Sequence, residues 1–368
     1  MKFIFSPTIL LPDDGHDLSK WAVIACDQYT SQPDYWEDLD AFVGEAPSTL
    51  RIVFPECYLG KDDKNRIENI NRTMDEYKST VLSRHFEGFM LVRRETTAGP
   101  RLGLIAAIDL EQYDFAPGTA PLIRPTEGTI EARLPPRMEI RRHATLESSH
   151  VLLLADDPGM TFIEPLYEAY KEREPAYDFE LYGGQRVTGW PVEETAFPAL
   201  EALYEHSDGL LFAVGDGNHS LATAKRVWEE IKRTLPEPQH ENNPSRYAMV
   251  EINNLHAASL VFEPIHRAIF SANREELTAF LNENGTSAQT VDQWMAAHPE
   301  CSVDYIHGKD ALETLIRKGA FGIEFEPFDK NGLFEYVRKN GPLPRKTFSM
   351  GEAEDKRYYL ECRRLTLT

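Results

Sequence analysis

Short apolar runs, separated by Gly, Pro and acidic turns, recur along the chain and predict buried β-strands. Residues 88–96 and 101–110 flank the turn at Thr97–Pro100, so we expect these two runs to pair as a hairpin. Further strands are expected at 21–29, 149–157, 185–192, 210–214, 245–255, 260–270, 320–328 and 356–367.

Apolar residues at helical spacing mark the helices. The clearest case is 63–82, where one face of the expected helix carries Ile67, Ile70, Met74, Tyr77 and Val81. Shorter helices are expected at 198–207, 275–284 and 311–319, and another is expected to start near Ser220 or Leu221.

The order of these elements predicts the fold class. Strands and helices interleave, but several neighbouring strands have no crossover helix between them, so we expect an α/β or α+β fold with mixed β-sheets and flanking helices. The chain 1–368 is expected to form one unit of two or three lobes. The Pro/Gly-rich stretch 114–125 suggests lobes at 1–118, 119–270 and 271–368.

The net charge limits the classes of partner that we expect the protein to bind. A formal net charge of −21 argues against nucleic-acid and anionic-membrane binding, but it allows a small anionic ligand held by local arginines. The four cysteines are scattered without metal-ligand spacing, and no apolar run approaches the ~18 residues of a membrane helix. We therefore expect a cytoplasmic protein, with its oligomeric state left open.

The stretch GDGNHS, residues 215–220, is the first candidate site. It joins an apolar strand to a helix, and a helix N-terminus attracts phosphate or carboxylate through its N–H groups and dipole. Gly215 and Gly217 allow close approach of a ligand, His219 can donate to an anion or move a proton, and Asp216 can accept a proton or hold Mg²⁺. The alternative is that Asn218 or Ser220 only caps the helix.

The second candidate is the arginine-rich segment 123–150. It holds Arg124, Arg133, Arg137, Arg141 and Arg142 among several glutamates, and such arginines can clamp an anionic substrate. The alternative is a solvated helix with paired Glu and Arg side chains. Within it, Thr126 is a candidate phosphate contact, Glu127 a candidate base or metal ligand, and His143 and His150 candidate proton carriers.

Weaker candidates are scattered elsewhere. His266 and Arg267 follow a proline beside an apolar run, where a buried and satisfied histidine is the commoner explanation. His256, the loop 345–349 and Cys26 are candidates of the same kind, and Cys26 lacks an identifiable partner histidine. The commonest metalloprotease, serine-hydrolase and zinc signatures do not occur.

Taken together, five stretches resemble a bacterial and archaeal family catalogued as domain-of-unknown-function family 1015. They are DLSKWAVIACDQYT, IRPTEGTIEARLPPRMEIRRHATLESSHVLLLADDP, AVGDGNHSLATAK, RYAMVEINNLHAASLVFEPIHR and LPRKTFSMGEAEDKRYYLE, spread over residues 17–361. The resemblance spans nearly the whole chain but does not name an activity.

Many members carry a DGHHR-type turn, which looks like the motif of the ParB/sulfiredoxin-like superfamily that includes free-serine kinases. The resemblance implies nucleotide phosphates at the turn and its helix. Asp216, Gly217 and His219 match the motif, whereas Asn218 and Ser220 replace its His and Arg. Arg124 and Arg226 are the candidates for the missing charge.

The leading expectation is a small-molecule enzyme, a phosphotransferase that uses Mg²⁺ with ATP or ADP. Asp216, His219 and Glu127 would be its catalytic residues, with Asp216 as the metal ligand. The phosphate-binding set would be Gly215, Gly217, Asn218, Ser220, Arg124, Thr126, Arg133, Arg137, His150, His266 and Arg267. Two alternatives stay open: a ligand-binding or regulatory protein without turnover, and a metal-assisted hydrolase.

Overall fold

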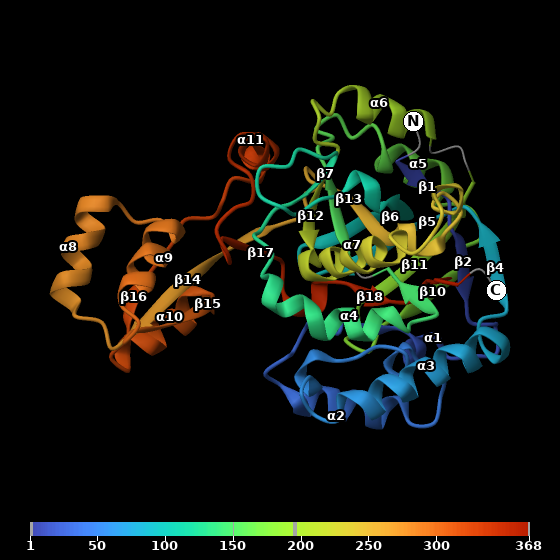
Figure 1. Cartoon of the computed structure of the whole chain (residues 1–368), viewed down its shortest axis with the longest axis horizontal. Helices are drawn as coiled ribbons and strands as arrows, with labels where there is room; N and C mark the ends of the chain where they lie inside the picture. The colour runs from blue at the N-terminus through green and yellow to red at the C-terminus, as the bar shows by residue number, and fades with distance from the viewer. Residues whose placement is uncertain (1–2, 150, 194–196, 367–368) are drawn as a thin grey trace. The chain divides into compact units, whose positions relative to one another are not determined.

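The computed structural model describes residues 3–149, 151–193 and 197–366. Contacts divide the chain into two compact units (Figure 1). The first unit comprises Met1–Leu260 and Glu352–Thr368, and the second unit comprises Val261–Gly351. The chain thus leaves the first unit after Leu260 and returns to it at Glu352.

A mixed sheet forms the centre of the first unit. Among the described residues it has nine strands in the order β10-β11-β5-β6-β13-β9-β12-β7, with β1 paired to β6. The pairs β13/β9 and β12/β7 are parallel and the others antiparallel, which confirms the expected mixed sheet. Their bounds are β1 Ile4–Phe5, β5 Phe89–Thr96, β6 Gly99–Asp109, β7 Ile123–Pro125, β9 Leu152–Ala155, β10 Tyr177–Glu180, β11 Arg186–Val192, β12 Phe212–Asp216 and β13 Tyr247–Asn254.

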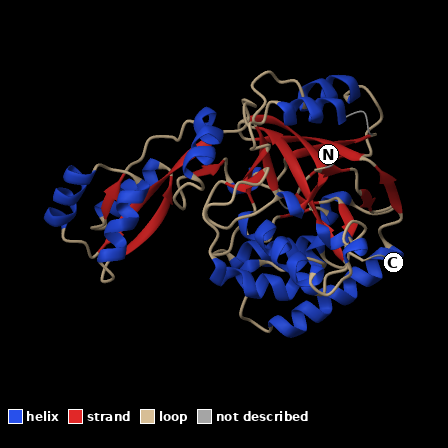
Figure 2. Ribbon diagram, turned by 45° about the horizontal axis from the view of Figure 1, so that its top comes forward, coloured by secondary structure: helices blue, strands red, loops and turns tan. Residues whose placement is uncertain are grey.

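Both faces of this sheet are buried, which explains why its strands lack a clear polar face. On one face Leu91 and Leu104 belong to a core that includes side chains of three helices, and on the other Met90 and Ile105 pack with a second set of helices. The first set is α5 Ile163–Tyr170, α6 Phe197–Glu205 and α7 Asn218–Lys232. The second set is α1 Leu18–Trp21, α2 Pro33–Val43 and α3 Asp63–Thr80. Figure 2 shows helices on both sides of the strands.

The described residues of the first unit also form two smaller sheets. One pairs β3 Val23–Ile24 with β18 Tyr358–Tyr359, and the other joins β2 Thr8–Leu11, β4 Arg84–Glu87, β8 Leu146–Ser148 and β19 Cys362–Arg364. The expected strand at 356–367 is therefore two short strands, because its halves pair in different sheets. Helix α4 Leu134–Arg142 also belongs to this unit.

The second unit is built around one long strand, β14 Phe262–Phe270. This strand pairs with β15 Ser302–His307, β16 Phe321–Ile323 and β17 Phe348–Met350. Its helices are α8 Arg274–Asn284, α9 Ala288–Ala297, α10 Lys309–Arg317 and α11 Leu333–Asn340. Helices α8 and α9 share a core with the sheet through Leu277 and Trp294.

The periodic segments fold as expected. Helix α3 buries Ile67, Ile70, Met74 and Tyr77, and strands β5 and β6 form the expected hairpin. The stretch 114–125 lies between β6 and β7, which belong to the same sheet, and the lobes 1–118, 119–270 and 271–368 remain a prediction. No helix among the described residues is both long and apolar enough to cross a membrane.

Candidate functional site

The GDGNHS turn lies where β12 ends and α7 begins. The register of β12 shifts between Val214 and Asp216, and Gly217 then adopts a left-handed conformation with φ 86° and ψ 24°. Because the helix begins at Asn218, two residues before the expected start, His219 belongs to its first turn. The capping interpretation is wrong, since the N-cap residue is Gly217 and no side chain caps the helix.

Asn218 is buried at this helix N-terminus without a partner. Its side chain belongs to a residue that is 9% exposed, and its Oδ1 atom has no hydrogen-bond partner in the described part of the chain. Side chains on a helix tilt toward its N-terminus, so Asn218 leans toward the end where the first-turn N–H groups emerge. A buried amide oxygen without a partner destabilises a fold.

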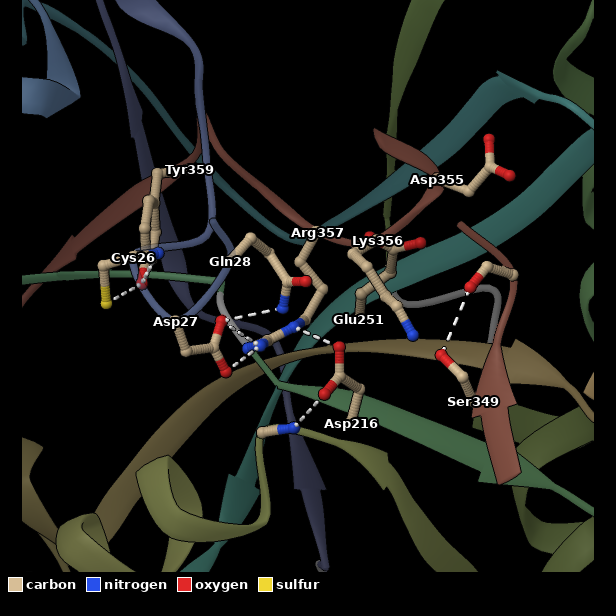
Figure 3. Close-up of polar contacts among 12 residues, drawn as sticks. Cys26, Asp27, Gln28, Asp216, Glu251, Ser349, Asp355, Lys356, Arg357 and Tyr359 are labelled. Carbon is tan, nitrogen blue, oxygen red and sulfur yellow. Dashed lines mark hydrogen bonds and ion pairs between the residues drawn. The ribbon is translucent and has the colours of Figure 1, made fainter. Parts of the chain in front are cut away.

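Asp216 is held from two sides. Its Oδ1 accepts from the Gly217 N–H at 3.0 Å, and its Oδ2 accepts from Arg357 Nε at 3.1 Å (Figure 3). Burial alone would raise the pKa of this carboxyl, but the charges of Arg357 and Lys356 outweigh it and lower the pKa. Asp216 is therefore an ionised acceptor at neutral pH rather than a proton donor.

Arg357 joins Asp216 to a second carboxylate. Its Nη2 lies 2.8 and 2.7 Å from the two oxygens of Asp27, and its side chain is only 2% exposed. The residue before it, Lys356, is also mostly buried, and its charge acts on Asp216. The backbone of this segment is fixed by Arg101, which donates to the carbonyls of Asp355 and Lys356 at 2.6 and 2.8 Å.

His219 faces the segment that carries Glu127. Its Nε2 accepts from the Ile130 N–H at 3.2 Å, which places the ring proton on Nδ1 in the neutral histidine. Nearby, the Thr126 hydroxyl donates to the Val214 carbonyl at 2.7 Å. The structure thus places Thr126 beside Val214 and Ile130 beside His219.

The arginines of 123–142 are engaged with other groups of the protein. Arg124 donates to the carbonyls of Pro121 and Gly209, which precede β7 and β12, whereas the turn follows the opposite end of β12. Arg133 is exposed. The remaining three form ion pairs: Arg137 with Glu56, Arg141 with Glu147, and Arg142 with Glu139 and Glu230. Only the Arg142–Glu139 pair has the helical spacing of the paired-helix interpretation, because Glu147 is a buried residue of β8 and Glu230 belongs to α7.

Two of the other histidine candidates, His266 and His256, are held by contacts within the fold. His266 is buried in the second unit, where its Nδ1 accepts from the Phe325 N–H at 3.2 Å. Arg267 is fully buried and donates to the carbonyls of Ile265, Arg345 and Lys346. In the first unit, His256 Nε2 lies 2.8 Å from Asp156 Oδ1. His143 is exposed, and His150 lies outside the described residues.

Cys26 has the properties of a structural thiol. Its Sγ accepts from the Tyr359 hydroxyl at 2.9 Å. Burial, together with the nearby charges of Asp27 and Glu56, raises the pKa of the thiol to about 12. At neutral pH the group is protonated, which disfavours nucleophilic chemistry.

Sequence reasoning missed the groups that hold Asp216. Arg357 lies 141 residues from Asp216 and 330 from Asp27, so no local pattern connects them. The available signals were Asp27 near the end of the strand expected at 21–29 and a Lys-Arg pair in EDKRYY. Glu56 was also missed, and burial raises the pKa of its carboxyl although Arg137 opposes this shift.

Comparison with known proteins places the chain in a family. Residues 10–366 match the family described as Protein of unknown function (DUF1015). The chain belongs to this family. No curated protein sequence matches it significantly.

Solved structures give only a low likeness. Free serine kinase in complex with AMP and a free serine kinase variant in complex with ADP each align with a TM-score of 0.36 and 12% identity, over 70% of this chain and 87% of theirs. A conserved hypothetical protein from Pyrococcus furiosus aligns with a TM-score of 0.34 and 12% identity, over 70% and 90%. These values are too low to carry a function over.

Proposed function

We propose that this chain is a small-molecule enzyme that binds the phosphate groups of a nucleotide at the turn 215–220 and transfers a phosphoryl group. The observation that carries the proposal is the unpartnered, buried amide of Asn218 at the N-terminus of α7. The helix end supplies N–H donors and a positive dipole, and Lys356 adds a positive charge close to Asp216. These are the groups that a phosphate needs.

A phosphate ligand would determine the orientation of the Asn218 amide. An asparagine amide presents either its oxygen or, after half a rotation, its nitrogen. The nitrogen of Asn218 would donate to a phosphate oxygen, which removes the unpartnered buried group. The Gly217 conformation, with φ 86°, brings the backbone of the turn close to this position without a Cβ in the way.

Mg²⁺ fits the site only together with the nucleotide. Among the described residues no three His, Cys, Asp or Glu side chains gather in an arrangement that could hold a metal ion. Magnesium commonly takes one or two carboxylates and completes its shell with phosphate oxygens and water. Asp216, ionised and fixed, is the carboxylate that would serve, and the bound ion would neutralise charge on the phosphates.

The transfer itself needs few protein groups. In the proposed reaction a substrate hydroxyl oxygen bonds to the terminal phosphorus, and the bond from that phosphorus to the bridging oxygen breaks, leaving the nucleoside diphosphate. The hydroxyl proton passes to a base, for which Glu127 is our candidate because its segment contacts the turn through Thr126 and Ile130. His219, held by Ile130, would position the ligand.

Thermal-shift measurements test the proposal. The panel contains ATP, ADP, CTP, pyrophosphate and phosphorylated amino acids, each with and without Mg²⁺. We expect a magnesium-dependent rise in the Tm of the parent with a nucleotide, since a ligand at a hundredfold excess over its Kd stabilises by about 2.7 kcal/mol. Asn218→Ala breaks no hydrogen bond within the described protein and removes an unpartnered buried oxygen, so its unliganded Tm should be no lower than that of the parent while the nucleotide shift falls.

His219→Ala should lose the nucleotide shift as well. The matched control is His143→Ala, which removes an exposed histidine at the end of α4 and should keep the full shift. A parent that responds to no member of the panel, or two site variants that respond like the control, would overturn phosphate binding at the turn. Release of nucleoside diphosphate by a responding protein then distinguishes an enzyme from a binding protein.

A further inference from the structure

We infer that Asp27 and Arg357 are positioning residues that form a clamp on Asp216 and fix its carboxylate for the ligand at the turn. The inference rests on the proposed function, because it assigns to these residues a role toward the same ligand. Neither residue belongs to the turn, and they lie near opposite ends of the chain.

Paired backbones hold two of the three residues. Asp27 follows β3 and Arg357 precedes β18, and these strands pair through Ile24 with Tyr358. The Ala25 N–H also donates to the Arg357 carbonyl at 2.8 Å. The backbones of Asp27 and Arg357 are therefore fixed relative to each other. Figure 3 shows their side chains beside Asp216, the last residue of β12.

Arg357 engages both carboxylates at once. Its Nη2 donates to Asp27 and its Nε donates to Asp216, so the planar guanidinium bridges the two carboxylates. Asp216 Oδ1 is meanwhile held by the Gly217 N–H at 3.0 Å. With one donor on each oxygen, the carboxylate of Asp216 cannot rotate freely, and each oxygen keeps acceptor capacity for a ligand.

The side chains of the clamp differ in solvent exposure, and this difference indicates their roles. The Arg357 side chain is 2% exposed, whereas those of Asp216 and Asp27 are 22% and 33% exposed. A buried arginine between two partly exposed carboxylates can orient them without touching the ligand itself. Lysine would keep the charge but could not bridge both acids, because its ammonium is a single point of contact.

The first experiment compares Arg357→Lys with Arg363→Lys. Arg363 is the matched control, because it is another buried arginine of the C-terminal segment and is paired with Glu147. Titration calorimetry with ADP and Mg²⁺ should show at least a tenfold weaker Kd for Arg357→Lys and an unchanged Kd for Arg363→Lys, although both substitutions lower the Tm. Equal affinities in the two variants would overturn the positioning role.

The second experiment tests the clamp without any ligand. In the parent, Asp27→Asn removes a partner of Arg357 and should lower the urea midpoint. In the Arg357→Met background, Asp27 and Asp216 face each other without the intervening charge, so Asp27→Asn should raise the midpoint. The reversal of sign is a property of the clamp that general loss of packing does not produce.

The outcomes separate this inference from the proposed function. A parent that binds no nucleotide overturns the proposed function and the positioning role together, even where the urea midpoints reverse. A parent that binds, combined with Arg357→Lys binding equally well, overturns only the positioning role. Urea midpoints that shift in the same direction in both backgrounds overturn the clamp.

Discussion

At the scale of single residues, Gly103 creates the space for a buried ion group. A Cβ built on Gly103 would lie 2.5 Å from Glu251 Oε1 and 2.8 Å from Asn253 Nδ2. Glu251 fills this space and reaches Arg94 at 3.3 Å and Arg101 at 3.9 Å. Arg101 in turn donates to the carbonyls of the two residues before Arg357. The lack of a side chain at Gly103 on β6 therefore supports the candidate site indirectly, through Glu251 and Arg101.

Gly103→Ala should therefore destabilise the first unit. Because the new methyl group would displace the Glu251 carboxylate from its arginines, we expect the free energy of unfolding to fall by about 3 kcal/mol. Urea unfolding followed by circular dichroism measures the change. Gly332→Ala is the control, since Gly332 has open space at its Cβ position and φ −84°, and it should change the value by less than about 0.5 kcal/mol. Equal losses would show that Gly103 makes no special space.

At the scale of elements, the sequence pattern predicted those helices and strands whose formation depends on residues close to them in the chain. The apolar spacing of 63–82 and the paired runs around Thr97–Pro100 became α3 and the β5/β6 hairpin. The C-terminal strand was predicted as one piece, but β18 and β19 pair with strands hundreds of residues earlier. Partners that distant decide where a strand breaks, and a single sequence does not show them.

The candidate site likewise has a part that the local sequence predicted and a part that it did not predict. The turn between β12 and α7 was predicted from its residues, because a strand, a glycine pair and a helix follow one another directly. The clamp from Asp27 and Arg357 was not predicted, because both side chains reach Asp216 through tertiary structure. The segment 123–150 was interpreted either as an anion clamp or as a helix with paired Glu and Arg side chains, and in the structure Arg137, Arg141 and Arg142 pair with glutamates.

The start of α7 depends on the backbone of Gly217. With φ 86° and ψ 24°, this residue is in the left-handed region, where a Cβ costs about 1–2 kcal/mol. Gly217→Ala should lower the free energy of unfolding by about that amount. Gly217→Asn should lower it less, since asparagine tolerates this region better than other residues with a side chain. Chemical unfolding of the three proteins checks the order Gly, Asn, Ala, and an alanine variant as stable as the asparagine variant would contradict it.

At the scale of the whole molecule, the two units should respond to acid in different pH ranges. In the first unit, Arg94 and Arg101 outweigh burial and lower the pKa of Glu251 from its ordinary value of 4.5. Stability from such a carboxylate is complete above the ordinary pKa and is lost as the pH falls through the folded value. In the second unit, burial is the largest cause that lowers the pKa of His266 from 6.5. As the pH falls, His266 therefore begins to change the stability of the second unit at a higher pH than Glu251 changes that of the first.

The sign for His266 follows from proton binding. Below pH 6.5 the unfolded chain takes up a proton at this histidine, while the folded unit keeps the buried ring neutral until its lower pKa is reached, so stability falls with pH. His298 in the same unit acts in the opposite direction, because the Trp294 carbonyl and Glu276 raise its pKa. The two histidines partly cancel in the parent, and a variant is needed to separate them.

His266→Asn separates the two effects. Asparagine keeps an acceptor for the Phe325 N–H but cannot take up a proton, so the variant should lose less stability than the parent between pH 7.0 and 5.5. Hydrogen exchange followed by mass spectrometry measures this loss of stability as a loss of protection in the peptides of β14 and β15. The difference between variant and parent is taken at each pH, so that the intrinsic exchange rates cancel. Peptides of β5 and β6 serve as the internal control, since they belong to the first unit and His266 belongs to the second. An equal loss of protection in both proteins would mean that His266 is not the group that makes the second unit acid-sensitive.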